Sequence, residues 1–263
     1  MAGIVVIGAG QAAASFVGKL RACGHAGPVT VIGEEHVPPY QRPPLSKAYL
    51  KGEMALERLF LRPEAWYREN RVDLRLDTRA DAIDLADRKV IAGGHEIPYS
   101  RLVLCTGSVP RRLPPGLGGA LDGVHVVRNL ADVDAMAPEM AKGGRLLVVG
   151  GGYIGLEAAA VAAGLGMEVT LIEAADRILQ RVAAKETSDF VRGVHQDHGV
   201  TIREGVGLDR LTGEARVTGA VLADGTELAC DMVIVGIGVT PATALAEAAG
   251  IETDNGIRVD ARG

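Results

Sequence analysis

Short apolar runs alternate along the chain with longer runs in which apolar residues recur at helical spacing. Residues 4–7, Ile-Val-Val-Ile, predict a buried strand, and after a glycine-rich turn a helical run continues to about Cys23. A second strand is expected at 29–33, ending at Glu34. A strand, a helix and a second strand in this order indicate a βαβ unit with parallel strands.

The second half of the chain repeats this pattern. A strand at 145–149, a glycine turn, an Ala-rich helical run to about Leu165 and a strand at 168–172 ending at Glu173 form the second copy. Each half also contains a short hairpin and a buried strand that ends in glycine, at 102–107 and 233–238. The fold class is therefore predicted to be α/β, with two Rossmann-like dinucleotide-binding domains in tandem.

The two glycine turns carry the candidate chemistry. They are Gly-Ala-Gly-Gln-Ala-Ala at 8–13 and Gly-Gly-Gly-Tyr-Ile-Gly at 150–155. In this motif the first glycine permits the tight turn, the second lets a pyrophosphate approach the backbone, and the third position allows close helix–strand packing. A single motif of this kind is weak evidence, because glycines can serve turns alone. Here each copy lies between a strand and a helix and has an acid at the expected distance, so both predict dinucleotide binding.

The acid of the second copy also predicts the coenzyme. A carboxylate at Glu173 would repel the 2′-phosphate of NADP, which favours NAD(H). Arg177 lies four residues further on and could weaken this preference, although it could equally form a surface salt bridge.

Composition and charge exclude several other classes of protein. The net charge of −5, without a polybasic run, argues against nucleic-acid binding, and no apolar stretch is long enough for a membrane span. A strand that begins at residue 3 leaves no room for a removable signal peptide. Three separated cysteines, Cys23, Cys105 and Cys230, offer neither a redox dithiol nor a zinc pair, and they favour a reducing cytoplasm.

No metal site is expected. His195 and His198 have a spacing that could bind a metal, but they lie in a polar stretch, 189–199, without a third ligand. A solvated helix face explains this pair better.

The segment 39–50, Pro-Tyr-Gln-Arg-Pro-Pro-Leu-Ser-Lys-Ala-Tyr-Leu, resembles one family closely. It is similar to the corresponding segment of the FAD-dependent NADH:ferredoxin reductases that serve cytochromes P450 and ring-hydroxylating dioxygenases. Further similarities to this family occur at 102–107, 148–157 and 235–241. The resemblance extends over the whole chain.

This resemblance implies a domain organisation in which the NAD domain is inserted into the FAD domain. Residues 1–113 would form the first part of the FAD-binding domain, 114–240 the NAD(H)-binding domain, and 241–263 the start of the return to an incomplete FAD domain. The family's C-terminal domain would be absent. We therefore expect that a protein ending at Gly263 binds NADH, holds FAD weakly or not at all, and reduces no ferredoxin.

The resemblance also implies site residues. Lys47, near the flavin, and Glu157, near the nicotinamide, would be the catalytic residues. A cation near a flavin can stabilise its anionic reduced form, although Lys47 could instead begin a surface helix and Glu157 could be an exposed helix residue. The FAD contacts would be Gly8, Gly10, Ala12, Ala13, Glu34, Arg42, Lys47, Ala80, Thr106, Gly107 and Arg128. The NAD contacts would be Gly150, Gly152, Tyr153, Ile154, Gly155, Glu157, Glu173, Gly236 and Gly238.

The implied function is hydride transfer from NADH to FAD, followed by single-electron transfer to a [2Fe–2S] ferredoxin. Two alternatives stay open. A related flavoprotein could use another acceptor, such as rubredoxin or oxygen. The second alternative is a redox-regulated binding protein similar to apoptosis-inducing factor. Such a protein would be expected to have basic patches, which this sequence lacks.

Overall fold

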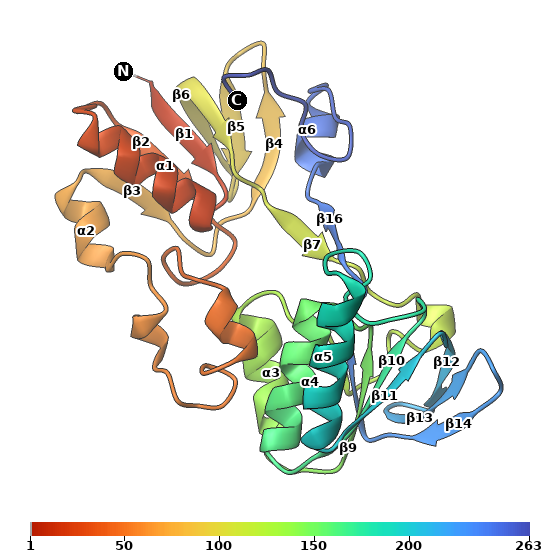
Figure 1. Cartoon of the computed structure of the whole chain (residues 1–263). Helices are drawn as coiled ribbons and strands as arrows, with labels where there is room; N and C mark the ends of the chain where they lie inside the picture. The colour runs from red at the N-terminus through yellow and green to blue at the C-terminus, as the bar shows by residue number, and fades with distance from the viewer. Residues whose placement is uncertain (1) are drawn as a thin grey trace. The chain divides into compact units, whose positions relative to one another are not determined.

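The computed structural model describes residues 2–263 and divides into two compact units. Unit 1 comprises the chain up to Gln41, Leu56–Val109 and Thr240–Gly263, and unit 2 comprises Arg42–Ala55 and Pro110–Val239. Each unit contains a parallel sheet with helices, so the predicted α/β class with two Rossmann-like domains is confirmed (Figure 1). The second unit is inserted in the sequence of the first.

Unit 1 is built on a six-stranded sheet in the order β3-β2-β1-β6-β5-β4. Strands β1, β2, β3 and the end of β6 run parallel, whereas β4, β5 and β6 form antiparallel hairpins. The strands are β1 (Gly3–Ile7), β2 (Val29–Ile32), β3 (Val72–Arg75), β4 (Ala80–Asp84), β5 (Lys89–Ala92) and β6 (His95–Leu104). The helical elements of this unit are α1 (Gln11–Ala22), the 3₁₀ turn η2 (Leu56–Arg58), α2 (Glu64–Glu69) and α6 (Ala244–Ala248).

The apolar run of β1 is continuous because both faces of this sheet are covered. Val6 belongs to a core with Val17 of α1 and Tyr67 of α2. Its neighbour Val5 points to the opposite face and belongs to a core with Val90 and other residues of the β4–β6 hairpins.

Unit 2 is built on a five-stranded, wholly parallel sheet in the order β11-β10-β9-β15-β8. A separate antiparallel sheet has the order β12-β13-β14. The strands are β8 (Val124–His125), β9 (Arg145–Val149), β10 (Glu168–Glu173), β11 (Val200–Glu204), β12 (Leu208–Gly213), β13 (Val217–Leu222), β14 (Glu227–Ala229) and β15 (Met232–Val235). The helical elements are η1 (Pro43–Ser46), η3 (Pro115–Leu117), α3 (Leu130–Met140), α4 (Tyr153–Gly164) and α5 (Lys185–Asp197).

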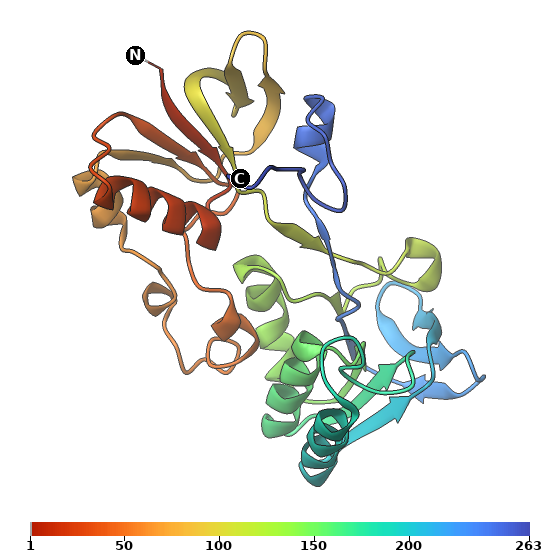
Figure 2. The same cartoon turned by 45° about the horizontal axis from the view of Figure 1, so that its top comes forward.

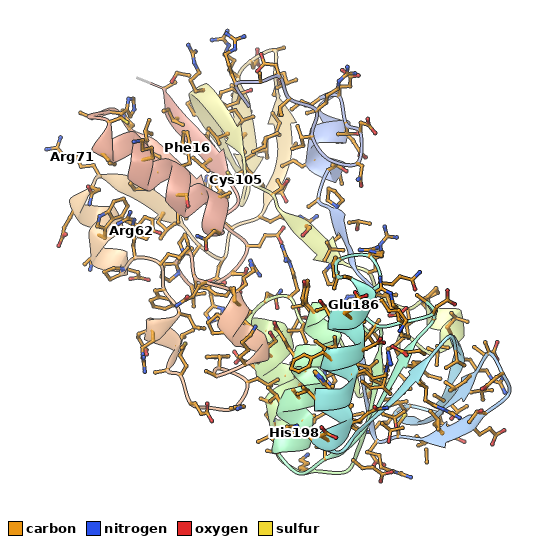
Figure 3. The ribbon with its side chains drawn as sticks, in the orientation of Figure 1. Phe16, Arg62, Arg71, Cys105, Glu186 and His198 are labelled. Carbon is orange, nitrogen blue, oxygen red and sulfur yellow. The ribbon has the colours of Figure 1, made fainter. Side chains whose placement is uncertain are left out.

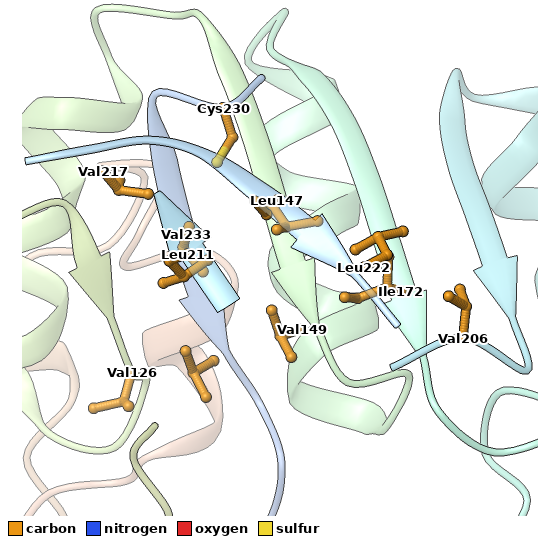
Figure 4. Packing of buried hydrophobic residues seen from close by; sticks show 12 residues of the cluster. Val126, Leu147, Val149, Ile172, Val206, Leu211, Val217, Leu222, Cys230 and Val233 are labelled. Carbon is orange, nitrogen blue, oxygen red and sulfur yellow. The ribbon is translucent and has the colours of Figure 1, made fainter. Parts of the chain in front are cut away.

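The core of unit 2 lies between its two sheets. The three long helices cover one face of the parallel sheet, and the antiparallel sheet covers the other (Figure 2). Leu147, Ile172 and Val233 of the parallel strands pack there against Leu211 and Leu222 of the antiparallel sheet (Figure 4). This two-sided burial holds the carboxyl ends of the parallel strands in fixed positions.

The chain passes between the units before and after Arg42–Ala55, and again within β7 (Ser108–Pro110) and β16 (Val239–Pro241). Among residues 2–263, no helix combines the length and the apolar character that crossing a membrane requires.

Candidate functional site

The glycine turn of unit 2 joins β9 to α4. Gly150 has a φ of +109°, and a Cβ on this residue would lie 2.5 Å from the carbonyl oxygen of Gly236. Only glycine fits such a position without a shift of the backbone. Gly152 is the N-cap of α4, where no side chain caps the helix and a Cβ would meet nothing within 4 Å. The first N–H groups of α4 therefore have open space in front of them for an anion.

A cavity of about 490 Å³ lies at this turn. It opens beyond the carboxyl ends of β9, β10 and β15, where open parallel sheets bind their ligands. Its volume is in the range of small-molecule and cofactor sites. Seven of the nine predicted NAD contacts line it, namely Gly150, Gly152, Tyr153, Ile154, Glu173, Gly236 and Gly238. Gly155 and Glu157 do not.

The cavity also has lining residues that the sequence motifs did not identify. Most of them lie in two segments that follow β10 and β11, 174–182 and 206–208, and Pro110 and Val127 complete the set. The rule that ligands bind beyond the carboxyl ends of parallel strands could have pointed to both segments, because each directly follows such a strand.

The side chain of Glu173, at the end of β10, is hydrogen-bonded to the backbone of two different segments. Its carboxylate accepts hydrogen bonds from the N–H groups of Gly151 and Ala175, each at 2.7 Å. The predicted ribose-binding acid thus also joins the glycine turn to the segment after β10. The same carboxylate belongs to the lining of the cavity.

The segment after β10 is folded back onto the glycine turn. Leu179 N–H donates to the carbonyl of Gly151 at 2.9 Å, and Leu179 has a φ of +54°, which is unusual for a side chain of this size. Arg177 donates to the buried hydroxyl of Ser188 at 2.5 Å and to the carbonyl of Ala183 at 2.9 Å. Arg177 is therefore a residue that organises this segment rather than one half of a surface salt bridge.

The structure brings the two predicted catalytic residues together in unit 2. Lys47 Nζ lies 2.6 Å from Oε2 of Glu157 on α4. The same oxygen accepts a hydrogen bond from the hydroxyl of Ser46 at 2.5 Å. Glu157 follows Tyr153 by four residues on α4, so both lie on the same side of the helix. The pair is half-exposed, with side-chain exposures of 49% for Lys47 and 30% for Glu157.

Two of the predicted FAD contacts also meet within unit 2. Arg42 donates to the carbonyl oxygen of Arg128 at 2.7 Å, and Arg128 N–H donates to Asp132 at 3.0 Å. Asp132 and Asn129 form a capping box at the start of α3. The segment that contains Arg42 and Lys47 is thus fixed to the amino end of α3 and to α4.

The glycine turn of unit 1 joins β1 to α1. Gly8 has a φ of +102°, and a Cβ there would lie 2.1 Å from the carbonyl oxygen of Cys105. Gly10 is the uncapped N-cap of α1, with nothing within 4 Å of a Cβ. Ala12 is exposed on α1, whereas Ala13 is buried in the core beneath it.

The remaining predicted FAD contacts of unit 1 lie beyond the ends of the strands or in β4. Glu34 follows β2, has a side-chain exposure of 68%, and lies 3.6 Å from Arg79. Thr106 donates its hydroxyl to the carbonyl of Ala242 at 2.8 Å, and Gly107 has a φ of +71°. Ala80 is the first residue of β4 and packs against the core.

The two histidines of the 189–199 stretch contact backbone carbonyls. His195 and His198 each direct a ring nitrogen to the carbonyl four residues earlier, at 2.9 and 2.7 Å, and His198 is exposed at the C-cap of α5 (Figure 3). No group of three or more potential metal ligands occurs within residues 2–263.

Comparison with known proteins identifies similar chains. The sequence matches the family model described as pyridine nucleotide-disulphide oxidoreductase over residues 2–263. It is 42% identical over 262 residues to a ferredoxin–NAD(P)(+) reductase of a Sphingomonas species, covering 99% of this chain and 63% of the relative. It is 40% identical to a putidaredoxin reductase of Pseudomonas putida, covering 98% of this chain and 62% of the relative. The chain therefore spans less than two thirds of the length of these curated relatives.

Solved structures agree with the sequence matches. The putidaredoxin reductase in a covalent complex with putidaredoxin superimposes with a TM-score of 0.92 at 39% identity, covering 97% of this chain and 63% of that one. A ferredoxin reductase from Rhodopseudomonas palustris gives a TM-score of 0.93 at 37% identity, covering 98% and 64%.

Proposed function

The chain belongs to the pyridine nucleotide-disulphide oxidoreductase family, and on this premise we propose that it carries electrons from NADH through FAD to a [2Fe–2S] ferredoxin. Membership of the family implies a flavin and a nicotinamide nucleotide as cofactors. The choice of FAD, NAD(H) and a ferredoxin is our proposal, as is a downstream cytochrome P450 or ring-hydroxylating dioxygenase. It is supported by the relatives, which include ferredoxin, putidaredoxin and rhodocoxin reductases.

The observation that carries the proposal is the cavity of unit 2. It combines the open N-terminus of α4, a close-approach glycine and a carboxylate in one site. In the proposed complex the turn at Gly150–Gly152 binds the pyrophosphate of NADH with backbone N–H groups. Glu173 accepts hydrogen bonds from the adenosine ribose and disfavours a 2′-phosphate at the same place.

The residues of the first glycine turn fit the adenosine half of FAD. Gly10 leaves the start of α1 uncapped and open, and Glu34 presents an exposed carboxylate beyond β2. When bound, FAD supplies hydride acceptance from NADH and release of single electrons to an iron–sulfur protein. The backbone N–H groups of this turn would hold the cofactor. Separately, Lys47 and Glu157 of unit 2 would provide a charged pair for the reaction.

A second acceptor is favoured by one observation. The chain is 38% identical to a rubredoxin–NAD(+) reductase of Pseudomonas putida, covering 98% of this chain and 67% of that relative. Rubredoxin is therefore the alternative acceptor. A cytoplasmic location is part of the proposal and is supported by three cysteines that form no disulfide among the described residues.

Coenzyme binding tests the proposal on this chain. The fluorescence of NADH is titrated with the 263-residue protein, and ADP-ribose and NADPH are used as competitors. We expect saturable binding that ADP-ribose displaces and that NADPH displaces only at concentrations about tenfold higher. Absence of any saturable NADH binding would contradict the proposed function.

The acceptor is tested separately. Because the 263-residue chain by itself is expected to reduce no ferredoxin, this test uses a protein that also contains the rest of the FAD domain. It is supplied with NADH under anaerobic conditions, and reduction of a [2Fe–2S] ferredoxin is compared with reduction of rubredoxin. Faster reduction of rubredoxin would replace the proposed partner with the alternative.

A further inference from the structure

Two polar side chains in residues 2–263 are almost wholly buried: Ser46 at 1% exposure and Ser188 at 0%. The hydroxyl of Ser188 has two partners in the segment after β10, namely Arg177 and the carbonyl of Ile178, which explain its burial. Ser46 ends the η1 turn, which packs on α4 and α3. A buried hydroxyl without a partner is unfavourable, so its contact indicates what it does.

The hydroxyl of Ser46 is directed to a carboxylate. It donates to Oε2 of Glu157 at 2.5 Å, whereas the nearest other acceptor, the carbonyl of Pro43, lies at the limit of 3.5 Å. A hydrogen bond from a hydroxyl to a carboxylate is shorter and stronger than one between neutral groups. Lys47 Nζ approaches the same Oε2 at 2.6 Å.

The two contacts leave the carboxylate asymmetric. The hydrogen bond from Ser46 ends on Oε2 of Glu157, and the closest approach of Lys47 is to the same oxygen. Lys47 is flexible and about half-exposed, so it cannot fix the orientation of the carboxylate by itself. Ser46 is enclosed and its backbone is set by the Pro-Pro turn, so it can.

We propose that Ser46 is a positioning residue that holds Glu157 by Oε2 and so presents Oε1 to the nicotinamide end of the coenzyme. This inference rests on the proposed function, because it assumes that NADH binds in unit 2 with Glu157 at its nicotinamide end. The ligand chemistry that fits Oε1 is an amide N–H, as in a carboxamide. ADP-ribose is NADH without the nicotinamide. Its affinity should therefore not depend on the contact with Oε1.

The experiment compares the dissociation constants of NADH, NAD⁺ and ADP-ribose for the 263-residue protein and its variants. In Ser46→Ala we expect NADH and NAD⁺ to bind about ten- to a hundredfold more weakly, the size of a lost hydrogen bond to a charged group. ADP-ribose binding should change by less than about twofold. Ser46→Cys keeps the volume with a weaker donor, and it should shift the constants in the same direction if Ser46→Ala does not fold.

Two further variants separate the possible explanations. Glu157→Ala should weaken NADH relative to ADP-ribose at least as much as Ser46→Ala, and Ser46→Ala should add nothing in the Glu157→Ala background. Tyr49→Phe is the matched control, because it removes another hydroxyl–carboxylate bond of the same segment, to Asp134 at 2.9 Å. It should leave all three constants unchanged.

The outcomes distinguish the inference from the function beneath it. If the wild-type protein binds none of the three ligands, or if Glu157→Ala leaves the ratio of NADH to ADP-ribose affinity unchanged, the proposed site itself is wrong. If Glu157→Ala changes that ratio and the Ser46 variants do not, the site stands and the role of Ser46 is overturned. Equal weakening of all three ligands in Ser46→Ala would mean that Ser46 only supports the fold.

Discussion

The two glycine turns of this chain have nearly the same backbone but different surroundings. Gly8 N–H donates to the carbonyl of Ile32 at 2.8 Å, and Gly150 N–H donates to the carbonyl of Ile172 at 2.8 Å. The carbonyl that excludes a Cβ belongs to Cys105 in the first case and to Gly236 in the second. The strand that closes the turn thus approaches in the same way in both units.

The acids beyond the second strands differ. Glu173 is bound by two backbone N–H groups, one of them in the glycine turn itself. Glu34 is mostly exposed and has only a long contact with Arg79. The same motif therefore produces a preorganised turn in unit 2 and a more open one in unit 1. Preorganisation lowers the cost of binding, so we expect unit 2 to bind its dinucleotide without help from another segment.

The largest expected effect comes from closing the turn of unit 2. In Gly150→Ala, the new side chain has an unfavourable positive φ and its Cβ collides with the backbone at Gly236. Each of these two effects costs about 1–3 kcal/mol. We expect NADH binding to weaken at least about a hundredfold in a fluorescence titration. Gly143→Ala is the control, because Gly143 also has a positive φ but a Cβ added there would meet nothing within 4 Å. Equal losses in both variants would show that strain alone, and not the close approach, is responsible.

The difference between the two acids can be tested by changing Glu173. Glu173→Gln keeps an acceptor for one of the two N–H groups but removes the charge, whereas Glu173→Ala removes both. If the carboxylate rejects a 2′-phosphate, both variants should reduce the preference for NADH over NADPH by about tenfold, which corresponds to about 1.4 kcal/mol. Glu173→Ala should in addition weaken NADH binding, because the glycine turn loses the hydrogen bond from Gly151 N–H to the carboxylate. If both variants keep the same preference for NADH over NADPH, Glu173 does not select the coenzyme, and Arg177 with its segment is the remaining candidate.

Much of the fold could be predicted from the sequence because it depends on local patterns. Strands β1, β9 and β10 follow from short apolar runs, and the glycine turns follow from spacing. The hairpin before the closing strand was predicted to be alike in both halves. In unit 1, however, β6 (His95–Leu104) continues without a break into the parallel sheet, whereas in unit 2 β14 ends before β15 begins.

The candidate site was less predictable because its remaining contacts join distant residues. Ser46 and Glu157 are 111 positions apart, and nothing in the local pattern around Ser46 indicates that its hydroxyl is buried. Helix α5 shows the same limit: Phe190 is apolar, yet it is 72% exposed, while the polar Ser188 lies inside. Tertiary packing, and not periodicity, decides which face of such a helix is covered.

A smaller difference between the units is expected in acid. In unit 2, β9 begins at an ion pair in which Asp231 accepts from the backbone N–H, Nε and Nη2 of Arg145 at 2.8–3.0 Å. In unit 1, β1 begins with uncharged contacts, such as Ile4 N–H to the carbonyl of Pro28. The hydrogen bonds from Arg145 lower the pKa of Asp231 from 3.8 to about 2.

The sign of this effect follows from linkage. A carboxyl whose pKa is lowered by folding stabilises the folded state above its unfolded pKa, and the stabilisation is lost as the pH falls through the folded value of about 2. Because the pair is half-exposed, we expect Asp231→Asn to lower the melting temperature by only about 1–3 °C near neutral pH. The difference from the wild type should vanish toward pH 2. A difference that stays constant over this range would mean that the variant acts through packing and not through charge.

The smallest effect concerns the thiols, which occupy different environments in the two units. Cys105 follows β6 (Figure 3), and its carbonyl oxygen lies close to Gly8. Cys230 precedes β15 in the core of unit 2. Burial raises the pKa of both thiols, that of Cys230 from 9.0 to about 11, whereas Cys23 is exposed. Because the thiolate is the reactive form, a rise of two pKa units lowers its fraction about a hundredfold at neutral pH. We expect an aromatic disulfide reagent to modify Cys23 first, Cys105 more slowly and Cys230 only on unfolding, as followed by mass spectrometry of peptides. Modification of Cys230 at the rate of Cys23 would show that the core of unit 2 opens readily, which would contradict the preorganised turn inferred for that unit.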